Sequence, residues 1–168
     1  AAEDVDASST LVIGSCAILD GPAPTLDELR AHVESRLHLA PRYRQRLRRT
    51  PFDLRAPGWV DDADFDIARH VTETTVPAPG FDAALADVMA QVMAPRMDRD
   101  HPLWDMTLVG GLAAGRWALV CRVHHALADG VSGTELLRVA YDVDGVPPTE
   151  VVALRTVPGR PSLAGQAL

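Results

Sequence analysis

Apolar residues in the first quarter of the chain follow the period of a buried strand and then that of a helix. Residues 10–19 form a nearly continuous apolar run that ends in a turn at 20–22, which predicts a buried strand. Thr25 and Glu28 then have the spacing of a capping box, which begins helices. The helix is expected to reach about Leu39 because one of its faces stays apolar, through Leu26, Leu29, Val33 and Leu37.

The middle of the chain predicts an extended segment, a second helix and a hairpin. After an irregular stretch rich in proline, residues 65–76 read as extended. Apolar residues recur at helical spacing from Asp82 until Pro95, so we expect an amphipathic helix there. Two β-leaning runs, 104–112 and 117–124, are joined by a short segment that contains glycine, which is typical of a hairpin.

The last part of the chain changes character. A third helix is expected over residues 132–143. Residues 144–168 show little periodicity and several prolines and glycines, which indicates a linker. The pattern as a whole predicts a mixed α/β domain over residues 1–143, followed by a linker over 144–168.

Composition agrees with a globular domain and narrows its partners. The 168 residues are 47% hydrophobic, which suffices for about one domain with a core. Lys and Arg total 16 against 23 Asp and Glu, so the formal net charge is −7. Because phosphate contacts need a basic surface, this balance argues against a nucleic-acid partner.

Cysteine content and hydropathy bear on the cellular location. Cys16 and Cys121 each lie inside an apolar run, which favours buried thiols in a reducing compartment over a disulfide framework. No apolar run approaches the ~20 residues that cross a bilayer, and no signal-peptide pattern opens the chain. We therefore expect a cytoplasmic protein without a transmembrane helix.

The strongest chemical signal is the segment His124-His125-Ala-Leu-Ala-Asp129-Gly130, where an apolar strand gives way to a helix. Neighbouring side chains of an extended strand point to opposite faces, so the two histidines are expected to face different surroundings. Histidine is suited to take a proton from a hydroxyl near neutral pH. One of the pair is therefore expected to be the working residue, with Asp129 as an ordering charge and Gly130 allowing a tight turn.

This segment resembles the HHxxxDG motif of the CoA-dependent acyltransferase superfamily, which includes chloramphenicol acetyltransferase, plant BAHD enzymes and peptide-synthetase condensation domains. Residues 98–105, Asp-Arg-Asp-His-Pro-Leu-Trp-Asp, are similar to the DRxRPLWE block of bacterial wax ester synthase/acyl-CoA:diacylglycerol acyltransferases. Residues 41–47 resemble that family's PRFRQRL segment, and Trp59, Phe65-Asp66 and His70-Val71 follow in the family's order. The chain departs from the family at His101, where Arg is usual, and at Asp105, where Glu is usual.

The resemblance implies the fold and the role of the chain. The fold would be the α/β, two-layer arrangement of chloramphenicol acetyltransferase. Family members are longer and have two similar halves, so the chain would be the N-terminal half of a two-subdomain enzyme. The other half would belong to the same polypeptide or be a separate chain. The resemblance also marks Pro102, Leu103, Trp104 and Gly130 as motif residues with structural roles.

The resemblance further implies an activity and assigns residues to it. A fatty acyl group would move from acyl-CoA, a co-substrate, to the hydroxyl of a diacylglycerol or long-chain alcohol, with no other cofactor. His125 would act as general base and His124 would brace the turn. Asp129 would hold the loop by a charge-paired contact, with Arg122 or an arginine of the second half as its partner. The protein would lie at the periphery of a membrane or of lipid inclusions.

Several alternatives stay open at this point. The chain could belong to another HHxxxDG acyltransferase, of condensation or polyketide type, or to a lipid-binding homologue without turnover. A metal site at His124, His125 and Asp129 is disfavoured, because adjacent histidines on a strand diverge. The arginine cluster from Arg42 to Arg49 could neutralise a CoA phosphate or a lipid headgroup, or it could be a solvated face.

Overall fold

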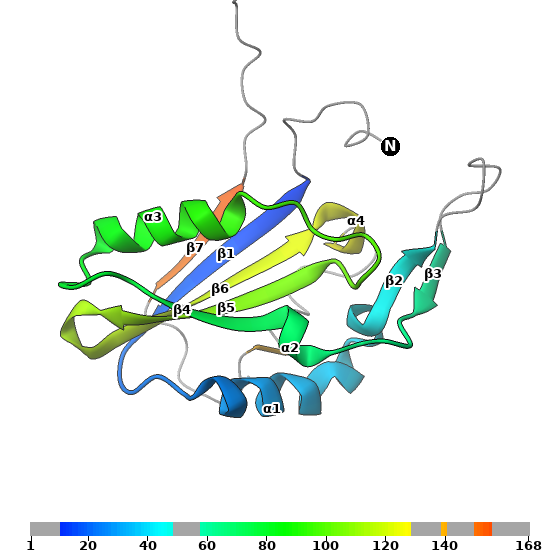
Figure 1. Cartoon of the computed structure of the whole chain (residues 1–168), viewed down its shortest axis with the longest axis horizontal. Helices are drawn as coiled ribbons and strands as arrows, with labels where there is room; N and C mark the ends of the chain where they lie inside the picture. Colours follow the sequence, from blue (N-terminus) through cyan, green and yellow to red (C-terminus); the bar gives the residue numbers. More distant parts are fainter. Residues whose placement is uncertain (1–10, 49–57, 129–138, 141–149, 156–168) are drawn as a thin grey trace, which may run out of the picture.

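A mixed five-stranded sheet lies at the centre of the computed structural model, with the strand order β4-β5-β6-β1-β7 (Figure 1). The structure describes residues 11–48, 58–128, 139–140 and 150–155, and only the backbone in the last of these ranges. The helices and strands in these ranges are β1 (Val12–Leu19), α1 (Leu26–Arg36), β2 (Gln45–Arg48), β3 (Gly58–Asp61), α2 (Ile67–His70), β4 (Val71–Thr75), α3 (Asp82–Met93), β5 (Trp104–Leu112), β6 (Arg116–His124), α4 (His125–Ala128) and β7 (Glu150–Arg155).

The predicted hairpin and the predicted first strand form the middle of this sheet. β5 and β6 pair antiparallel around a short 3₁₀ turn at Ala113–Gly115, and β1 pairs antiparallel with the other edge of β6. β4 runs parallel to β5, which makes the sheet mixed. The α/β class predicted from the sequence is therefore confirmed.

The segment expected to be a linker contains a strand. β7 pairs antiparallel with β1, from Ile18 opposite Glu150 to Ile13 opposite Arg155. Prolines and glycines flank this run of six residues, so the composition of the whole segment concealed it. The division of the chain at residue 143 stays a prediction.

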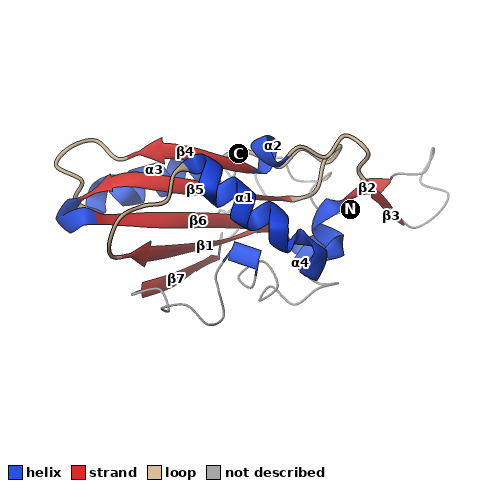
Figure 2. Ribbon diagram, turned by 90° about the horizontal axis from the view of Figure 1, so that it is seen from below, coloured by secondary structure: helices blue, strands red, loops and turns tan. Residues whose placement is uncertain are grey.

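Helices cover both faces of the sheet in the described part of the chain. In Figure 1, α3 lies above the sheet and α1 below it, and Figure 2 shows α1 crossing the strands. One core packs Leu29 and Val33 of α1 against alternate residues of β5 and β6. The other core packs Leu85 and Val88 of α3 against the intervening residues. Both faces are apolar because β5 and β6 alternate between two buried surfaces.

Local sequence explains where α1 begins and why a further helix interrupts the segment expected to be extended. Thr25 caps α1 through the predicted capping box, in which the Glu28 N–H donates to Thr25 Oγ1 (3.2 Å) and the Thr25 N–H donates to Glu28 Oε2 (2.8 Å). Asp66 accepts the N–H of Ala68 (2.9 Å) and begins the single turn α2. The prediction of an extended segment over residues 65–76 is therefore wrong for α2 and right for β4.

The second predicted helix is confirmed as α3, which ends shortly before Pro95. Of the third predicted helix, the structure describes Val139 and Ala140, which are helical and buried in the α1 core. The rest of that predicted helix lies outside the described residues. Asp129 and Gly130 also lie outside them.

Candidate active site

The two adjacent histidines occupy the junction between β6 and α4. His124 is the last residue of β6 and His125 is the first residue of α4. The His124 side chain is buried, and its Nδ1 accepts the N–H of Ala126 at 3.1 Å. This contact satisfies one of the free N–H groups at the start of α4, so the His124 ring braces the strand-to-helix turn.

His125 differs from His124 in its surroundings. Its residue is exposed, and its backbone N–H donates to the carbonyl of Leu11 at 2.7 Å. The backbone bond attaches the start of α4 to the chain just before β1 and leaves the ring at the surface. The two histidines therefore face different surroundings, as the sequence predicted, because the strand ends between them.

The two sequence blocks that carry the family resemblance meet in the sheet. Trp104 lies opposite Val123 in the β5–β6 ladder. The N–H of His124 donates to the carbonyl of Leu103 at 3.0 Å, and the N–H of Trp104 donates to the carbonyl of Pro102 at 3.0 Å. Pro102, Leu103 and Trp104 are all buried. The Pro-Leu-Trp segment thus forms the wall beside the histidine pair.

Arg122 connects the two blocks by charge. Its guanidinium binds Asp105 in two places, with Nε 2.8 Å from Oδ1 and Nη2 2.6 Å from Oδ2. Its Nη1 also donates to the carbonyl of Pro95 at 2.9 Å, just after α3. The sequence offered Arg122 as one partner for Asp129, which lies outside the described residues, so that pairing stays a prediction. The sequence could have suggested the Arg122–Asp105 pair, because residues 98–105 resemble the family's DRxRPLWE block and Asp105 stands there in place of the acidic Glu.

A third histidine, to which the sequence assigned no role, lies in an aromatic stack. The His70 ring lies between Phe65 and Trp104, with ring centroids at 5.1 and 4.7 Å and nearly parallel planes. Its Nδ1 is 2.8 Å from the Trp104 carbonyl, so Nδ1 carries the proton and donates it. Burial lowers the pKa of His70 below its ordinary value of 6.5, and the bond to the carbonyl opposes this effect in part. Burial therefore favours the neutral form of His70.

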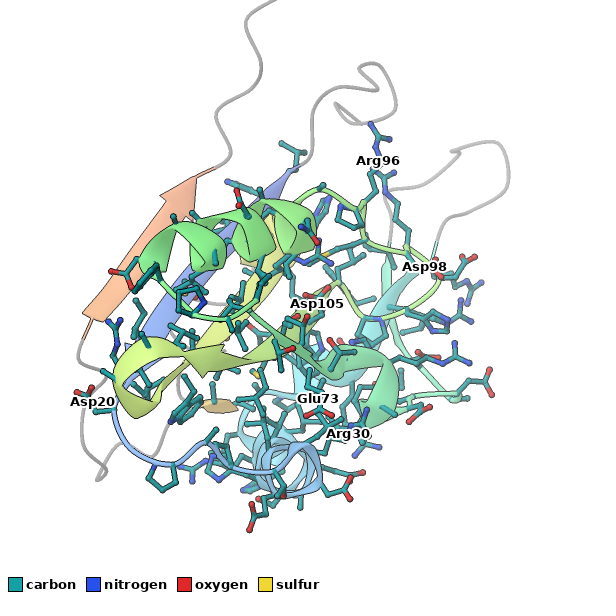
Figure 3. The ribbon with its side chains drawn as sticks, turned by 60° about the vertical axis from the view of Figure 1, so that its left-hand side comes forward. Asp20, Arg30, Glu73, Arg96, Asp98 and Asp105 are labelled. Atoms are coloured by element: carbon teal, nitrogen blue, oxygen red, sulfur yellow. The ribbon has the colours of Figure 1, made fainter. Side chains whose placement is uncertain are left out.

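A cavity of about 300 Å³ opens beside these residues. Its wall includes the Arg122–Asp105 pair, Trp104 and His70 on the inner side. In Figure 3, Asp105 lies in the interior, whereas Arg96 and Asp98 lie on the outer loop after α3. The cavity is lined by Arg69, His70, Arg96, Met97, Asp98, His101, Pro102, Trp104, Asp105 and Arg122.

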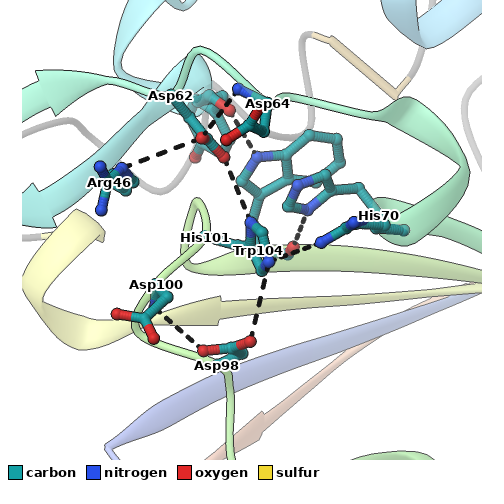
Figure 4. Close-up of polar contacts among 10 residues, drawn as sticks. Arg46, Asp62, Asp64, His70, Asp98, Asp100, His101 and Trp104 are labelled. Atoms are coloured by element: carbon teal, nitrogen blue, oxygen red, sulfur yellow. Dashed lines mark hydrogen bonds and ion pairs between the residues drawn. The ribbon is translucent and has the colours of Figure 1, made fainter.

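His101 organises the rim of this cavity (Figure 4). Arg69 Nη1 lies 2.6 Å from His101 Nε2, and a guanidinium can only donate, so Nε2 accepts. The other ring nitrogen, Nδ1, then carries the proton and faces Oδ2 of the buried Asp62 at 3.3 Å. His101 thus bridges Arg69 and Asp62, where the family usually has an Arg.

The described arginines of residues 42–49 pack on aromatic rings as well as lying near an acidic side chain. The guanidinium of Arg42 lies 4.9 Å from the centre of the Trp59 ring, and that of Arg44 lies 5.0 Å from the centre of the Phe65 ring. Arg46 Nε is 3.9 Å from Asp62 Oδ1. The members of the cluster therefore contact different neighbours, some aromatic and one acidic.

The described part of the chain contains neither a cluster of metal-ligating side chains nor a membrane-spanning helix. Within residues 11–48, 58–128, 139–140 and 150–155, no three His, Cys, Asp or Glu side chains are grouped so as to hold a metal ion. In the same ranges, no helix has the length and apolar character needed to cross a membrane.

Comparison with protein families identifies the family of the chain. The family model described as the wax ester synthase/diacylglycerol acyltransferase catalytic domain matches residues 5–167. The chain belongs to this family. Among the named relatives of the chain is "Probable diacyglycerol O-acyltransferase tgs1" of Mycobacterium tuberculosis, which is 46% identical over 136 residues. A second relative from that organism, "Probable diacyglycerol O-acyltransferase tgs3", is 38% identical over 143 residues.

Solved structures agree with the family and with the fold. The wax ester synthase/diacylglycerol acyltransferase from Marinobacter aquaeolei VT8 matches with a TM-score of 0.62 and 28% identity, over 79% of this chain and 34% of that one. The starter condensation domain of rhizomide synthetase matches with a TM-score of 0.65 at 16% identity, over 83% of this chain and 33% of that one, which supports the fold alone.

The chain is shorter than the relatives that it matches. The alignment with tgs1 covers 81% of this chain but 29% of the relative, and the alignment with tgs3 covers 84% of this chain and 53% of the relative. The chain thus corresponds to one part of a longer acyltransferase architecture.

Proposed function

We propose that this chain supplies the histidine-bearing part of an enzyme that moves a fatty acyl group from acyl-CoA to the hydroxyl of a diacylglycerol or a long-chain alcohol. The observation that carries the proposal is the β6–α4 junction, where a buried, bracing His124 precedes an exposed His125. Family membership and the names of the relatives support the acyl transfer chemistry. The two acceptor classes, diacylglycerol and long-chain alcohol, both belong to the proposal.

The proposed reaction is direct transfer with His125 as general base. The acceptor hydroxyl gives its proton to His125 while its oxygen attacks the thioester carbonyl, and the carbon–sulfur bond then breaks. The CoA thiolate leaves, and His125 returns the proton to that sulfur. A thiolate is a good leaving group, so a base and correct positioning supply most of what the reaction needs, and no acyl-enzyme forms.

The remaining roles are proposals that extend beyond the described residues. Asp129 would hold the loop after α4 through an arginine of the second half, since Arg122 is engaged by Asp105. Gly130 would permit the turn into the following segment. The second half would complete the substrate channel, in the same polypeptide or as a separate chain. The enzyme would work in the cytoplasm at the surface of a membrane or lipid inclusion.

Replacement of His125 tests the proposal directly. The complete gene product is assayed with palmitoyl-CoA and either a diacylglycerol or hexadecanol, as wild type and as His125→Ala. Loss of the base is expected to lower kcat by roughly 100-fold to 10,000-fold, the usual contribution of general-base catalysis. Ester formation is followed by chromatography, and CoA release by a thiol reagent.

The matched control is His38→Ala, which removes an exposed histidine in the 3₁₀ turn Leu37–Leu39 after α1 and is expected to keep wild-type turnover. Undiminished transfer by His125→Ala would remove His125 from the mechanism. Turnover only with a carrier-bound acyl group, or tight acyl binding without turnover, would each contradict the proposed reaction and favour the condensation-type or the lipid-binding alternative.

A further inference from the structure

The dipeptide Leu103–Trp104, at the start of β5, is held from two sides by two histidines. The carbonyl of Leu103 accepts the N–H of His124 at 3.0 Å from the β6 side. The next carbonyl, that of Trp104, points the other way and accepts from His70 Nδ1 at 2.8 Å. Successive carbonyls of a strand point to opposite edges, so this clamp follows directly from the backbone of β5.

His70 replaces a missing strand partner at this point. The β4–β5 ladder begins at Val71 opposite Met106, so backbone pairing with β4 starts only after the Trp104 carbonyl. A buried carbonyl without a donor is costly, and the His70 ring supplies that donor one residue before β4 begins. The indole N–H of Trp104 donates to the Tyr43 carbonyl at 2.7 Å, which fixes the ring as well.

We propose that His70 is a positioning residue for the histidine pair, because its bond to the Trp104 carbonyl holds the strand end that receives the His124 N–H. His124 braces α4, and α4 carries His125, so the orientation of the base depends on this strand end. The effect on catalysis rests on the function proposed above for His125. The link from His70 to His124 does not depend on that function.

Two variants separate the hydrogen bond from the aromatic stack. His70→Asn keeps an N–H donor near the position of Nδ1 and loses the ring. His70→Phe keeps a ring between Phe65 and Trp104 and loses the donor. The proposal assigns the positioning to the hydrogen bond. His70→Asn is therefore expected to restore the positioning of the strand end that His70→Phe loses.

The first readout is amide hydrogen exchange of the 168-residue chain, followed at single residues by NMR. In His70→Phe, exchange at the His124 amide is expected to accelerate about tenfold relative to the central-strand amide of Val120, as for the loss of one buried hydrogen bond. In His70→Asn, the ratio of the exchange rate at the His124 amide to that at the Val120 amide is expected to stay within about threefold of wild type. General destabilisation would accelerate both amides together and leave their ratio unchanged.

The second readout is steady-state turnover of the complete gene product. His70→Phe is expected to lower kcat about tenfold while the KM for palmitoyl-CoA stays within about twofold, and His70→Asn is expected to recover most of kcat. His38→Phe and His38→Asn are the matched controls. His38 Nδ1 contacts the Ser35 carbonyl at 2.8 Å in the same manner, far along the chain from the β6–α4 junction.

The outcomes separate the two proposals. An unchanged His124-to-Val120 exchange ratio in His70→Phe, or a His70→Asn variant as impaired as His70→Phe, would overturn the positioning role even in an active enzyme. An inactive wild type would refute the proposed function, and the exchange ratios would still decide whether His70 holds the strand end.

Discussion

At the scale of single residues, the site depends on three histidines, of which two are buried and one is exposed. His124 and His70 are almost fully buried and each has a defined hydrogen bond, whereas His125 is exposed. Histidine can serve each role because its two ring nitrogens donate or accept independently. The sequence predicted the difference between His124 and His125 from strand geometry. It could not predict the stack around His70, because Phe65 and Trp104 meet there only through tertiary packing.

Burial of His70 predicts a specific dependence of stability on pH. Burial lowers its pKa in the folded state below the ordinary value of 6.5, so the unfolded chain binds this proton more readily. The stabilisation from His70 is therefore complete above pH 6.5 and is lost as the pH falls toward the folded-state pKa. Urea unfolding between about pH 8 and about pH 5.5 measures this slope.

His70→Asn is the control for that slope, because asparagine does not titrate in this range. The variant is expected to show a flatter free energy of unfolding over the same pH interval. Equal slopes in the two proteins would mean that His70 does not take part in the acid sensitivity of the fold.

At the scale of elements, one arginine holds three segments together. Arg122 of β6 binds Asp105 of β5 through two atoms and the Pro95 carbonyl after α3 through a third. A two-point arginine–carboxylate pair fixes geometry as well as charge. It therefore sets the position of the segment after α3 relative to the strand that ends at His124.

Asp105→Asn is expected to destabilise the fold by about 2–3 kcal/mol, because it leaves a mostly buried guanidinium without its countercharge. Asp82→Asn is the matched control. Asp82 forms the exposed pair with Arg116 at 3.0 Å, and its loss is expected to cost less than about 1 kcal/mol. Chemical denaturation of both variants gives the two values, and equal losses would show that burial does not strengthen the inner pair.

The elements differ in how well the sequence predicted them. β1, α1, α3 and the β5–β6 hairpin were predictable, because each has a clear period and a local signal at its end, such as the capping box at Thr25. α2 was missed because a single turn capped by Asp66 is too short to show a helical period. β7 was missed because pairing with β1 identifies it, and that partner lies far away in the sequence.

At the scale of the whole molecule, the first and the last strand of the described chain are neighbours in the sheet. β1 lies between β6 and β7, so the first strand has its partners in the second half of the sequence. The pairing of β7 with β1 and the family match over residues 5–167 agree with a unit that extends past residue 143. The position of the domain boundary remains a prediction.

Removal of residues 144–168 tests that boundary. Without β7, the outer edge of β1 loses its backbone partner, and an exposed strand edge favours association between chains. Residues 1–143 are therefore expected to melt at a lower temperature and to self-associate in size-exclusion chromatography. A truncated chain with the melting temperature and elution of the parent would show that 144–168 acts only as a linker.

The place of β1 in the sheet also affects how the protein is made. A ribosome synthesises β1 before β6 and β7, so the apolar run of β1 has no sheet partner until synthesis has passed His124. The local β5–β6 hairpin can form as soon as it emerges, whereas pairing with β1 must close a long loop. An unpaired apolar strand on a nascent chain is a site for chaperone binding and for aggregation. β1 thus precedes both of the strands that pair with it, so the fold protects it late.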